Sequence, residues 1–227
     1  MTSTEPNPAS ILATFEGRDT VVFDLDGTLH GGGRDADPAG DSARVTGLRV
    51  RHLVGVDDPF GAFAAFDRMV RAARPGMSKP AALSAWFGIG LAEMNRFRET
   101  HETPEAHVRP HPGIDAALDV FGSRFRLVLA TNNSPRLARR ILRLLGIAED
   151  RFAVVVAAED AGAPKPAAAF FAHVVKAAGT SYDRCVSVGD GLVTDIEPAR
   201  ALGFATYHVR GPRDVVHAAR VLRGMLQ

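Results

Sequence analysis

The sequence predicts an α/β fold: a doubly wound parallel sheet, with an α-helical domain inserted after the first strand. From residue 109 to the end, short apolar runs alternate with amphipathic segments, several of which end at a glycine. This alternation is typical of a parallel sheet covered by helices on both faces. Between 42 and 108, apolar residues instead recur at helical spacing, without strand-like β-branched runs. The predicted domains are therefore a core of residues 1–29 and 109–227 and a helical domain of residues 30–108.

The first strand is predicted at Thr20–Leu25, after a loose tail and a short helix at Ile11–Phe15. It ends with Asp24 and Asp26, which face the same side of an extended chain because they are two residues apart. Gly27 then lets the backbone turn sharply. Unpaired buried carboxylates are unfavourable, and a bound cation relieves that penalty. The pattern favours a strand end that holds a hard divalent metal and offers one carboxylate as a nucleophile; the alternative is an acidic hairpin turn.

The residues His30–Gly40 are interpreted as a linker, because they contain three consecutive glycines and a proline. A glycine loop that cradles phosphate needs a specific spacing and a following helix, and this stretch has neither. Residues 42–108 predict about four helices, whose aromatic side chains are expected to form a core or the underside of a lid. Five side chains of this domain could contact a ligand or face solvent: His52, Arg68, Arg74, Trp86 and Arg96.

The rest of the chain predicts further strands and helices in alternation. The strands are predicted at Arg126–Ala130, Ala153–Ala157, Cys185–Val188 and Ala205–Val209. The helices are predicted at Ile114–Phe121, Pro135–Leu145, Pro166–Ala178, Asp195–Leu202 and Val215–Met225. Gly146, Gly179 and Gly203 follow three of these helices and favour their termination. In such a sheet the carboxyl ends of the strands share one edge, where ligands bind.

A polar segment, Thr131-Asn132-Asn133, directly follows one predicted strand. Ser134 is a good helix cap after it, and Pro135 is a good first helical residue. A hydroxyl and free backbone N–H groups at the start of a helix favour the binding of phosphate. The alternative is a plain polar loop with a capping serine.

Lys165 is flanked by Pro164 and Pro166, which restrict the backbone and fix the direction of the lysine. Because the chain has only three lysines, we interpret Lys165 as functional rather than as a solvated surface residue. Asp190 lies at the end of the following strand, and Asp195 opens the next helix. Asp195 is interpreted as a second acid of the same site, although it could merely stabilise the positive end of that helix.

The composition is that of an ordinary globular chain: of 227 residues, 46% are hydrophobic and 23% are charged. The net charge of +1 suggests neither a nucleic-acid partner nor an anionic membrane. Cys185 is the sole cysteine, so no intrachain disulfide forms and a packed thiol is expected. The N-terminus has no apolar signal sequence and no run reaches membrane-spanning length, so a cytoplasmic protein is expected.

The polar segments, taken in order, resemble the four motifs of the haloacid dehalogenase-like (HAD) hydrolases. The matching segments are DLDGT at 24–28, TNN at 131–133, the lysine in PKP at 164–166, and GDGLVTD at 189–195. The resemblance spans most of residues 20–203 and implies a Rossmann-like core with a helical cap inserted after the first motif. Within the superfamily, the chain looks most like the capped small-molecule phosphatases, which include phosphoglycolate phosphatase-like and pyrimidine nucleotidase-like members.

Two residues depart from the family pattern. Gly191 stands where these proteins often carry serine, so one hydroxyl near the metal ligands is missing. Pro198 lies in a helix where a small residue is usual. Because proline is tolerated only in the first turn of a helix, that helix is expected to begin near Thr194 or Asp195.

The resemblance implies a Mg²⁺-dependent phosphatase that hydrolyses a small-molecule phosphate monoester through an aspartyl-phosphate. Asp24 would be the nucleophile, and Asp26 would protonate the leaving alcohol and then activate water. The expected metal ligands are Asp24, the backbone carbonyl of Asp26 and Asp190, with Asp195 holding bound water or the ligand shell. The expected phosphoryl-binding groups are Lys165, Thr131 and Asn132. The cap would close over the site and recognise the leaving group.

Other functions fit the same motifs. A dehalogenase lacks the second acid, so Asp26 argues against that activity. A phosphosugar mutase would keep Asp26 and transfer the phosphoryl group to a sugar. A non-catalytic HAD-like binding module is the alternative outside the enzymes. The sequence leaves the identity of the phosphate ester and the oligomeric state open.

Overall fold

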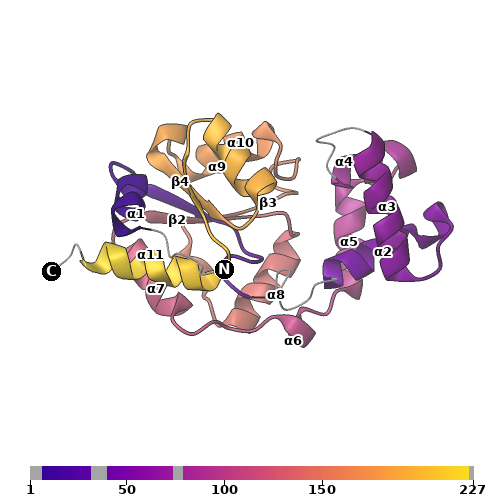
Figure 1. Ribbon diagram of the computed structural model, residues 1–227, viewed down its shortest axis with the longest axis horizontal. Coiled ribbons are helices and arrows are strands. Elements are labelled where there is room, and N and C mark those ends of the chain that lie inside the picture. The colour runs from indigo at the N-terminus through magenta and orange to yellow at the C-terminus, as the bar shows by residue number, and fades with distance from the viewer. Residues whose placement is uncertain (1–6, 32–39, 74–78, 225–227) are drawn as a thin grey trace. The chain divides into compact units, whose positions relative to one another are not determined.

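The computed structural model describes three stretches of the chain: residues 7–31, 40–73 and 79–224. The chain forms two compact units, one made of Met1–Gly33 and Val108–Gln227 and the other of Arg34–His107. Most of the predicted linker at 30–40 lies outside the described residues. Figure 1 shows that the first unit contains the sheet and that the described part of the second is helical.

The first unit is built on a parallel sheet of five strands in the order β3-β2-β1-β4-β5. The strands are β1 (Thr20–Phe23), β2 (Arg126–Thr131), β3 (Val154–Ala157), β4 (Cys185–Gly189) and β5 (Ala205–His208). After β1, the chain adds β2 and β3 on one side of that strand and then β4 and β5 on the other side. This order confirms the predicted doubly wound sheet. The crevice at such a reversal, here at the carboxyl end of β1, is where ligands bind.

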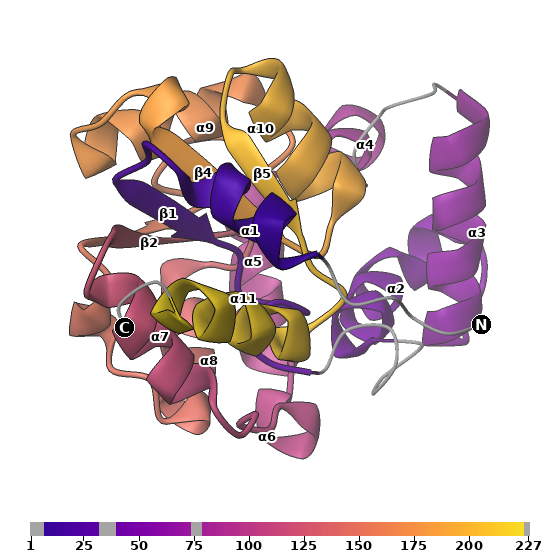
Figure 2. The ribbon, with the colours of Figure 1, turned by 60° about the vertical axis from the view of Figure 1, so that its left-hand side comes forward.

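Helices cover both faces of the sheet (Figure 1). They are α1 (Pro8–Phe15), α7 (Ile114–Gly122), α8 (Pro135–Leu145), α9 (Ala168–Ala178), α10 (Glu197–Ala201) and α11 (Pro212–Gly224). Because successive strand residues point to opposite faces, Val21 and Phe23 pack with α1, α7, α8 and α11, whereas Val22 packs with α9 and α10. Figure 2 shows α1 beside α11, which brings the first and last helices together. Cys185 lies in the second core, where burial raises the pKa of its thiol to about 11, as expected for a packed thiol.

Several elements begin or end a few residues away from their predicted bounds. β1 ends at Phe23 because the chain turns at once, with the Leu29 N–H donating to the Leu25 carbonyl at 3.0 Å. α11 begins at Pro212 rather than Val215, since a proline in the first turn needs no N–H partner. Two short 3₁₀ turns, Glu149–Arg151 and Tyr182–Arg184, were not expected from the sequence.

The expectation that the helix carrying Pro198 begins near Thr194 or Asp195 is wrong. Leu192–Ile196 forms a π-helical turn, and α10 starts anew at Glu197. The N–H of Ile196 donates to the Gly191 carbonyl, five residues back, at 3.2 Å. Pro198 thus falls in the first turn of α10, where proline is tolerated.

The second unit contains five helices in its described residues, one more than the approximate number predicted. They are α2 (Asp41–Val54), α3 (Pro59–Ala73), α4 (Lys79–Phe87), α5 (Leu91–His101) and the single turn α6 (Pro104–His107). Their core is centred on Phe66, which packs against Trp86 and Phe87 at ring-centroid distances of 6.2 and 5.9 Å. These aromatics therefore stabilise the unit itself, as one of the two sequence interpretations expected.

None of the helices in the described part of the chain combines the length and the apolar character that crossing a bilayer requires.

Candidate active site

Asp24 lies at the centre of the carboxyl edge of the sheet. Its strand neighbour Phe23 pairs with Leu129 of β2 and Val188 of β4, so Asp24 emerges between the ends of those strands. The Asp24 N–H donates to the Val188 carbonyl at 2.9 Å, which extends the sheet by one bond. Only 9% of Asp24 is exposed. The strand thus delivers a buried carboxylate to the switch point of the sheet.

Gly27 lets the turn after Asp24 approach the β4 loop closely. Its φ is +79°, a left-handed conformation that favours glycine. A Cβ added at this position would lie 2.4 Å from Asp190 Oδ2. Glycine is therefore needed at position 27 for two reasons: the backbone angle, and the close approach of the loops that carry Asp24 and Asp190.

Three carboxylates gather at this edge. One oxygen from each of Asp24, Asp190 and Asp195 lies within 4.8 Å of the other two. Burial raises the pKa of Asp24 to about 7, helped by the charges of Asp195 and Asp26 and opposed by Lys165. A single lysine does not neutralise three carboxylates, and hard oxygen donors suit a divalent cation such as Mg²⁺. The cluster therefore fits the metal that the sequence led us to expect.

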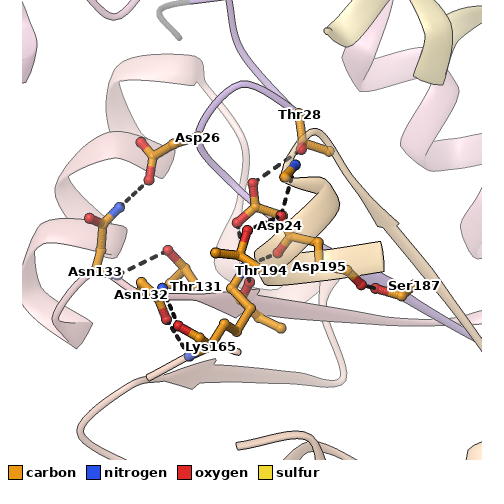
Figure 3. A network of polar contacts seen from close by, with 12 residues as sticks. Asp24, Asp26, Thr28, Thr131, Asn132, Asn133, Lys165, Ser187, Thr194 and Asp195 are labelled. Carbon is orange, nitrogen blue, oxygen red and sulfur yellow. Dashed lines mark hydrogen bonds and ion pairs between the residues drawn. The ribbon is translucent and has the colours of Figure 1, made fainter. Parts of the chain in front are cut away.

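Lys165 bridges two of these acids (Figure 3). Its Nζ lies 2.7 Å from Asp24 Oδ1 and 2.5 Å from Asp195 Oδ1, and it donates to the Ala130 carbonyl at 3.0 Å. Burial by itself would lower the pKa of Lys165, but the two carboxylates outweigh it and raise that pKa. The lysine therefore stays charged although it is only 5% exposed, and it fixes the direction of the Asp24 side chain.

Asn132 holds the backbone of the lysine loop. Its Oδ1 accepts from the Lys165 N–H at 2.7 Å, and its Nδ2 donates to the Lys165 carbonyl at 3.2 Å. The Lys165–Pro166 peptide bond is cis. The Asn132 side chain thus positions Lys165, a role that the sequence did not indicate, while its predicted contact with substrate stays a prediction.

Thr131 and Ser134 form the start of α8 beside the cluster. The Thr131 Oγ1 is buried and accepts from the Asn133 N–H at 3.1 Å. Ser134 caps α8 by accepting from the Leu137 N–H at 3.2 Å, as its sequence context predicted. The positive end of α8 therefore lies next to the predicted phosphoryl-binding residues.

Asp26 stands apart from the acid cluster. Figure 3 shows its carboxylate directed toward Asn133 rather than toward Asp24. Asn133 Nδ2 donates to Asp26 Oδ2 at 2.6 Å, and His30 Nε2 lies 3.2 Å from Asp26 Oδ1. The side chain of Asp26 is 51% exposed. The expectation that the Asp24 and Asp26 side chains face one spot is wrong: the strand ends at Phe23, so the two acids do not lie on an extended chain, and the Asp26 carboxylate is not one of the clustered oxygens. Metal binding by the Asp26 backbone carbonyl stays a prediction.

Sequence reasoning missed His30 and Asn133. Asn133 belongs to a motif that was recognised, but its side chain was given no role. His30 opens a glycine-rich stretch and was assigned to a linker, yet it is 2% exposed. Burial lowers the pKa of His30, and the Asp26 carboxylate raises it above the ordinary value on balance. The available signal was its spacing, four residues after Asp26.

Thr194 supplies a hydroxyl near the position where Gly191 lacks one. The Asp195 Oδ2 accepts from the Gly191 N–H at 3.0 Å and from Thr194 Oγ1 at 2.9 Å. A Cβ at Gly191 would lie 2.0 Å from Thr194 Oγ1. A serine at position 191 would therefore clash with the hydroxyl of Thr194 in its observed position.

The candidate contact residues of the helical unit have different environments. His52 and Arg96 line a groove of about 660 Å³ between α2 and α5, together with Arg49 and Phe97. Trp86 packs in the core of that unit, as described above. Arg68 is exposed on α3, and Arg74 lies outside the described residues. Their contact with a substrate stays a prediction.

The sheet topology is that of a Rossmann-like α/β protein. The acids and the lysine at its carboxyl edge form a cluster of the kind found in enzyme active sites. The family model of the haloacid dehalogenase-like hydrolases matches residues 18–203. The chain therefore belongs to the haloacid dehalogenase-like family and is a hydrolase, which confirms the resemblance read from the motifs. A search of curated proteins found no match.

Several solved structures have a similar fold. A haloacid dehalogenase-like hydrolase from Streptococcus pneumoniae has a TM-score of 0.58 and 18% identity, covering 93% of this chain and 99% of that one. The HAD hydrolase YfnB from Bacillus subtilis, bound to magnesium, has a TM-score of 0.56 and 19% identity, covering 90% and 100%. A β-phosphoglucomutase from Clostridium difficile has a TM-score of 0.55 and 19% identity, covering 88% of each. At these identities the likeness shows the fold, including the inserted helical unit.

Proposed function

We propose that this hydrolase is a Mg²⁺-dependent phosphatase that cleaves small-molecule phosphate monoesters through an aspartyl-phosphate on Asp24. The observation that carries the proposal is the buried contact between Asp24 and Lys165 at the centre of an acidic cluster. It combines a carboxylate of fixed direction with a cation that attracts phosphate. Magnesium in the Bacillus subtilis hydrolase of similar fold agrees with the proposed metal.

In the first step, an Asp24 carboxylate oxygen attacks phosphorus as the bond to the leaving alcohol breaks. Lys165 and the N–H groups at the start of α8 attract the phosphoryl oxygens. Asp26 gives its proton to the leaving oxygen. Bound Mg²⁺, held by Asp24, Asp190 and the Asp26 carbonyl with Asp195 in support, would neutralise phosphoryl charge.

In the second step, Asp26 takes a proton from water, the water oxygen attacks phosphorus, and the Asp24–phosphorus bond breaks. Inorganic phosphate leaves and Asp24 returns to its carboxylate form, so the proton taken replaces the one given. Charge neutralisation matters because two like unit charges about 4 Å apart repel by roughly 4 kcal/mol at an effective dielectric of about 20. That energy corresponds to a factor of about a thousand in rate.

The test is a phosphate-release screen with Mg²⁺ over phosphoglycolate, nucleoside monophosphates and sugar phosphates, with p-nitrophenyl phosphate as a general substrate. We expect turnover of at least one phosphate ester, loss of turnover in EDTA, and recovery when excess Mg²⁺ is added. Full activity in chelator would contradict the metal requirement. Conversion of a sugar phosphate to its isomer without phosphate release would favour the mutase alternative.

A further inference from the structure

Asp26 is held at both carboxylate oxygens although its side chain is half exposed. Asn133 Nδ2 donates to Oδ2 at 2.6 Å from the loop after β2, and His30 Nε2 contacts Oδ1 at 3.2 Å from the same turn as Asp26. An exposed aspartate without such contacts samples several rotamers. The Asn133 contact, which Figure 3 shows, and the His30 contact together restrict this carboxylate to a single orientation.

The burial of His30 needs the Asp26 contact. The residue is 2% exposed, and its Nδ1 has no hydrogen-bond partner within the part of the chain that the structure describes. Burying a polar ring is unfavourable unless it forms hydrogen bonds, so the contact through Nε2 offsets part of that penalty. Because an ionised carboxylate only accepts, the Nε2 proton belongs to the histidine.

The backbone around His30 also fixes its place. His30 forms a bridge with Asp26, and Gly31 forms an antiparallel bridge with Arg109. These two contacts place the backbone of His30 next to that of Asp26, independently of the side-chain hydrogen bond. The histidine is therefore part of an ordered structure at the carboxyl edge of the sheet.

We propose that His30 is a positioning residue that, together with Asn133, orients the Asp26 carboxyl group for proton transfer to the leaving oxygen. This inference rests on the proposed phosphatase function. A carboxylate has about four acceptor sites, so the contacts with Asn133 and His30 are compatible with the proton that Asp26 transfers. A general acid acts only within hydrogen-bond reach of the atom it protonates, which makes its orientation decisive.

The role predicts a dependence on the leaving group. An alkyl or sugar alkoxide leaves poorly unless it is protonated, whereas p-nitrophenolate leaves without a proton. The ratio kcat/KM covers every step up to departure of the leaving group. Loss of positioning therefore lowers kcat/KM for alkyl phosphates and hardly changes it for p-nitrophenyl phosphate, whereas general structural damage lowers both.

The experiment compares His30→Phe, His30→Gln and His30→Asn on an alkyl phosphate from the screen and on p-nitrophenyl phosphate. Since a positioned general acid contributes typically about 10²–10⁴-fold, we expect His30→Phe to lower kcat/KM about tenfold or more for the alkyl phosphate and less than about threefold for the aryl one. His30→Gln, whose amide reaches Asp26, should restore most of the loss. His30→Asn, which carries the same amide on a shorter stem, should not.

Equal losses on both substrates, or equal behaviour of the Gln and Asn variants, would overturn the positioning role. The Gln and Asn pair decides the question even if His30→Phe fails to fold. A wild-type protein that cleaves neither substrate would instead overturn the phosphatase function, and this inference with it. An active wild type with unselective variants would overturn the inference alone.

Discussion

Single residues set the charge at the carboxyl edge of the sheet, where three aspartates meet one lysine. Lys165 binds Asp24 and Asp195 at once, so the two acids share a cation and keep fixed directions. Asp195 is held further by the Gly191 N–H and the Thr194 hydroxyl. The cluster is thus ordered by the protein's own hydrogen bonds.

The coupling of Gly191 and Thr194 gives a prediction at this scale. Gly191→Ser, although the family resemblance leads us to expect serine here, places a Cβ 2.0 Å from Thr194 Oγ1. We expect it to destabilise the protein by about 1–3 kcal/mol, as overpacking does, and to lower phosphatase activity. Denaturant unfolding and phosphate release measure the two effects.

The matched control is Gly191→Ser combined with Thr194→Ala. Removing the threonine hydroxyl relieves the nearest contact, and the new serine can donate to Asp195 in its place. Only part of the stability and activity should return, because the added Cβ still lies 2.5 Å from Asp195 Oδ2 unless that side chain moves. A single variant as stable and active as the wild type would show that the hydroxyl is not confined to its observed position.

At the scale of elements, α11 depends on an acid in its first turn. Asp214 is 9% exposed, and its Oδ2 accepts from the Arg210 N–H at 2.9 Å and from Arg210 Nε at 3.1 Å. Burial would raise the pKa of Asp214, but these bonds outweigh it and lower that pKa below its ordinary value of 3.8. The ionised carboxylate is thus favoured in the folded protein.

Asp214→Asn is therefore expected to destabilise the protein at pH 7 by about 1–2 kcal/mol, because it removes charge-assisted hydrogen bonds from a buried acceptor. A lowered folded pKa contributes stability that is present above the unfolded pKa and is lost as pH falls through the folded pKa. The difference between wild type and variant should accordingly narrow below about pH 4. Urea unfolding at pH 7 and pH 3 measures it, and a difference independent of pH would contradict the ionic contribution.

Elements that bury one face were predictable from the sequence, because apolar spacing and terminal glycines determine them. α8 occupies Pro135–Leu145 and ends at Gly146, as predicted. The π-helical turn at Leu192–Ile196 was not predicted. It differs from an α-helix only in that its N–H groups donate to the carbonyl five residues back instead of four, and amino-acid composition does not indicate this difference.

Within the candidate site, strand ends indicated Asp24, Lys165 and the two acids after β4, because parallel strands bring their carboxyl ends to one edge. The contact of Asn132 was not predictable, and that of His30 was indicated only by its spacing four residues after Asp26. Asn132 meets the Lys165 backbone across 33 residues of sequence. His30 follows a motif but precedes three glycines, so local composition suggested a linker.

At the scale of the whole molecule, the acidic cluster joins loops that follow β1 and β4, with Lys165 from the loop after β3. A cation that binds only this folded arrangement stabilises the entire first unit by mass action. We expect added Mg²⁺ to raise the thermal midpoint, with about 2.7 kcal/mol gained at a free concentration of 100 Kd. Calorimetry with and without EDTA measures this shift.

Asp190→Asn should abolish most of the shift, because it removes a charge from the cluster. Asp183→Asn is the control: Asp183 is exposed in the 3₁₀ turn before β4, away from the carboxyl edge, and its variant should keep the shift. If Mg²⁺ raised the thermal midpoint of both variants equally, the cation would bind at a site other than the acidic cluster.

The most direct test of the account is whether Asp24 becomes phosphorylated during turnover. The wild-type protein, mixed with Mg²⁺ and a substrate found in the screen, is quenched in acid within one turnover and digested for mass spectrometry. We predict one added phosphoryl group on the peptide that contains Asp24, and none in Asp24→Asn, which should also lose phosphate release while keeping its circular dichroism spectrum. Phosphate release that persists in Asp24→Asn, or a phosphoryl group on another residue, would contradict the account.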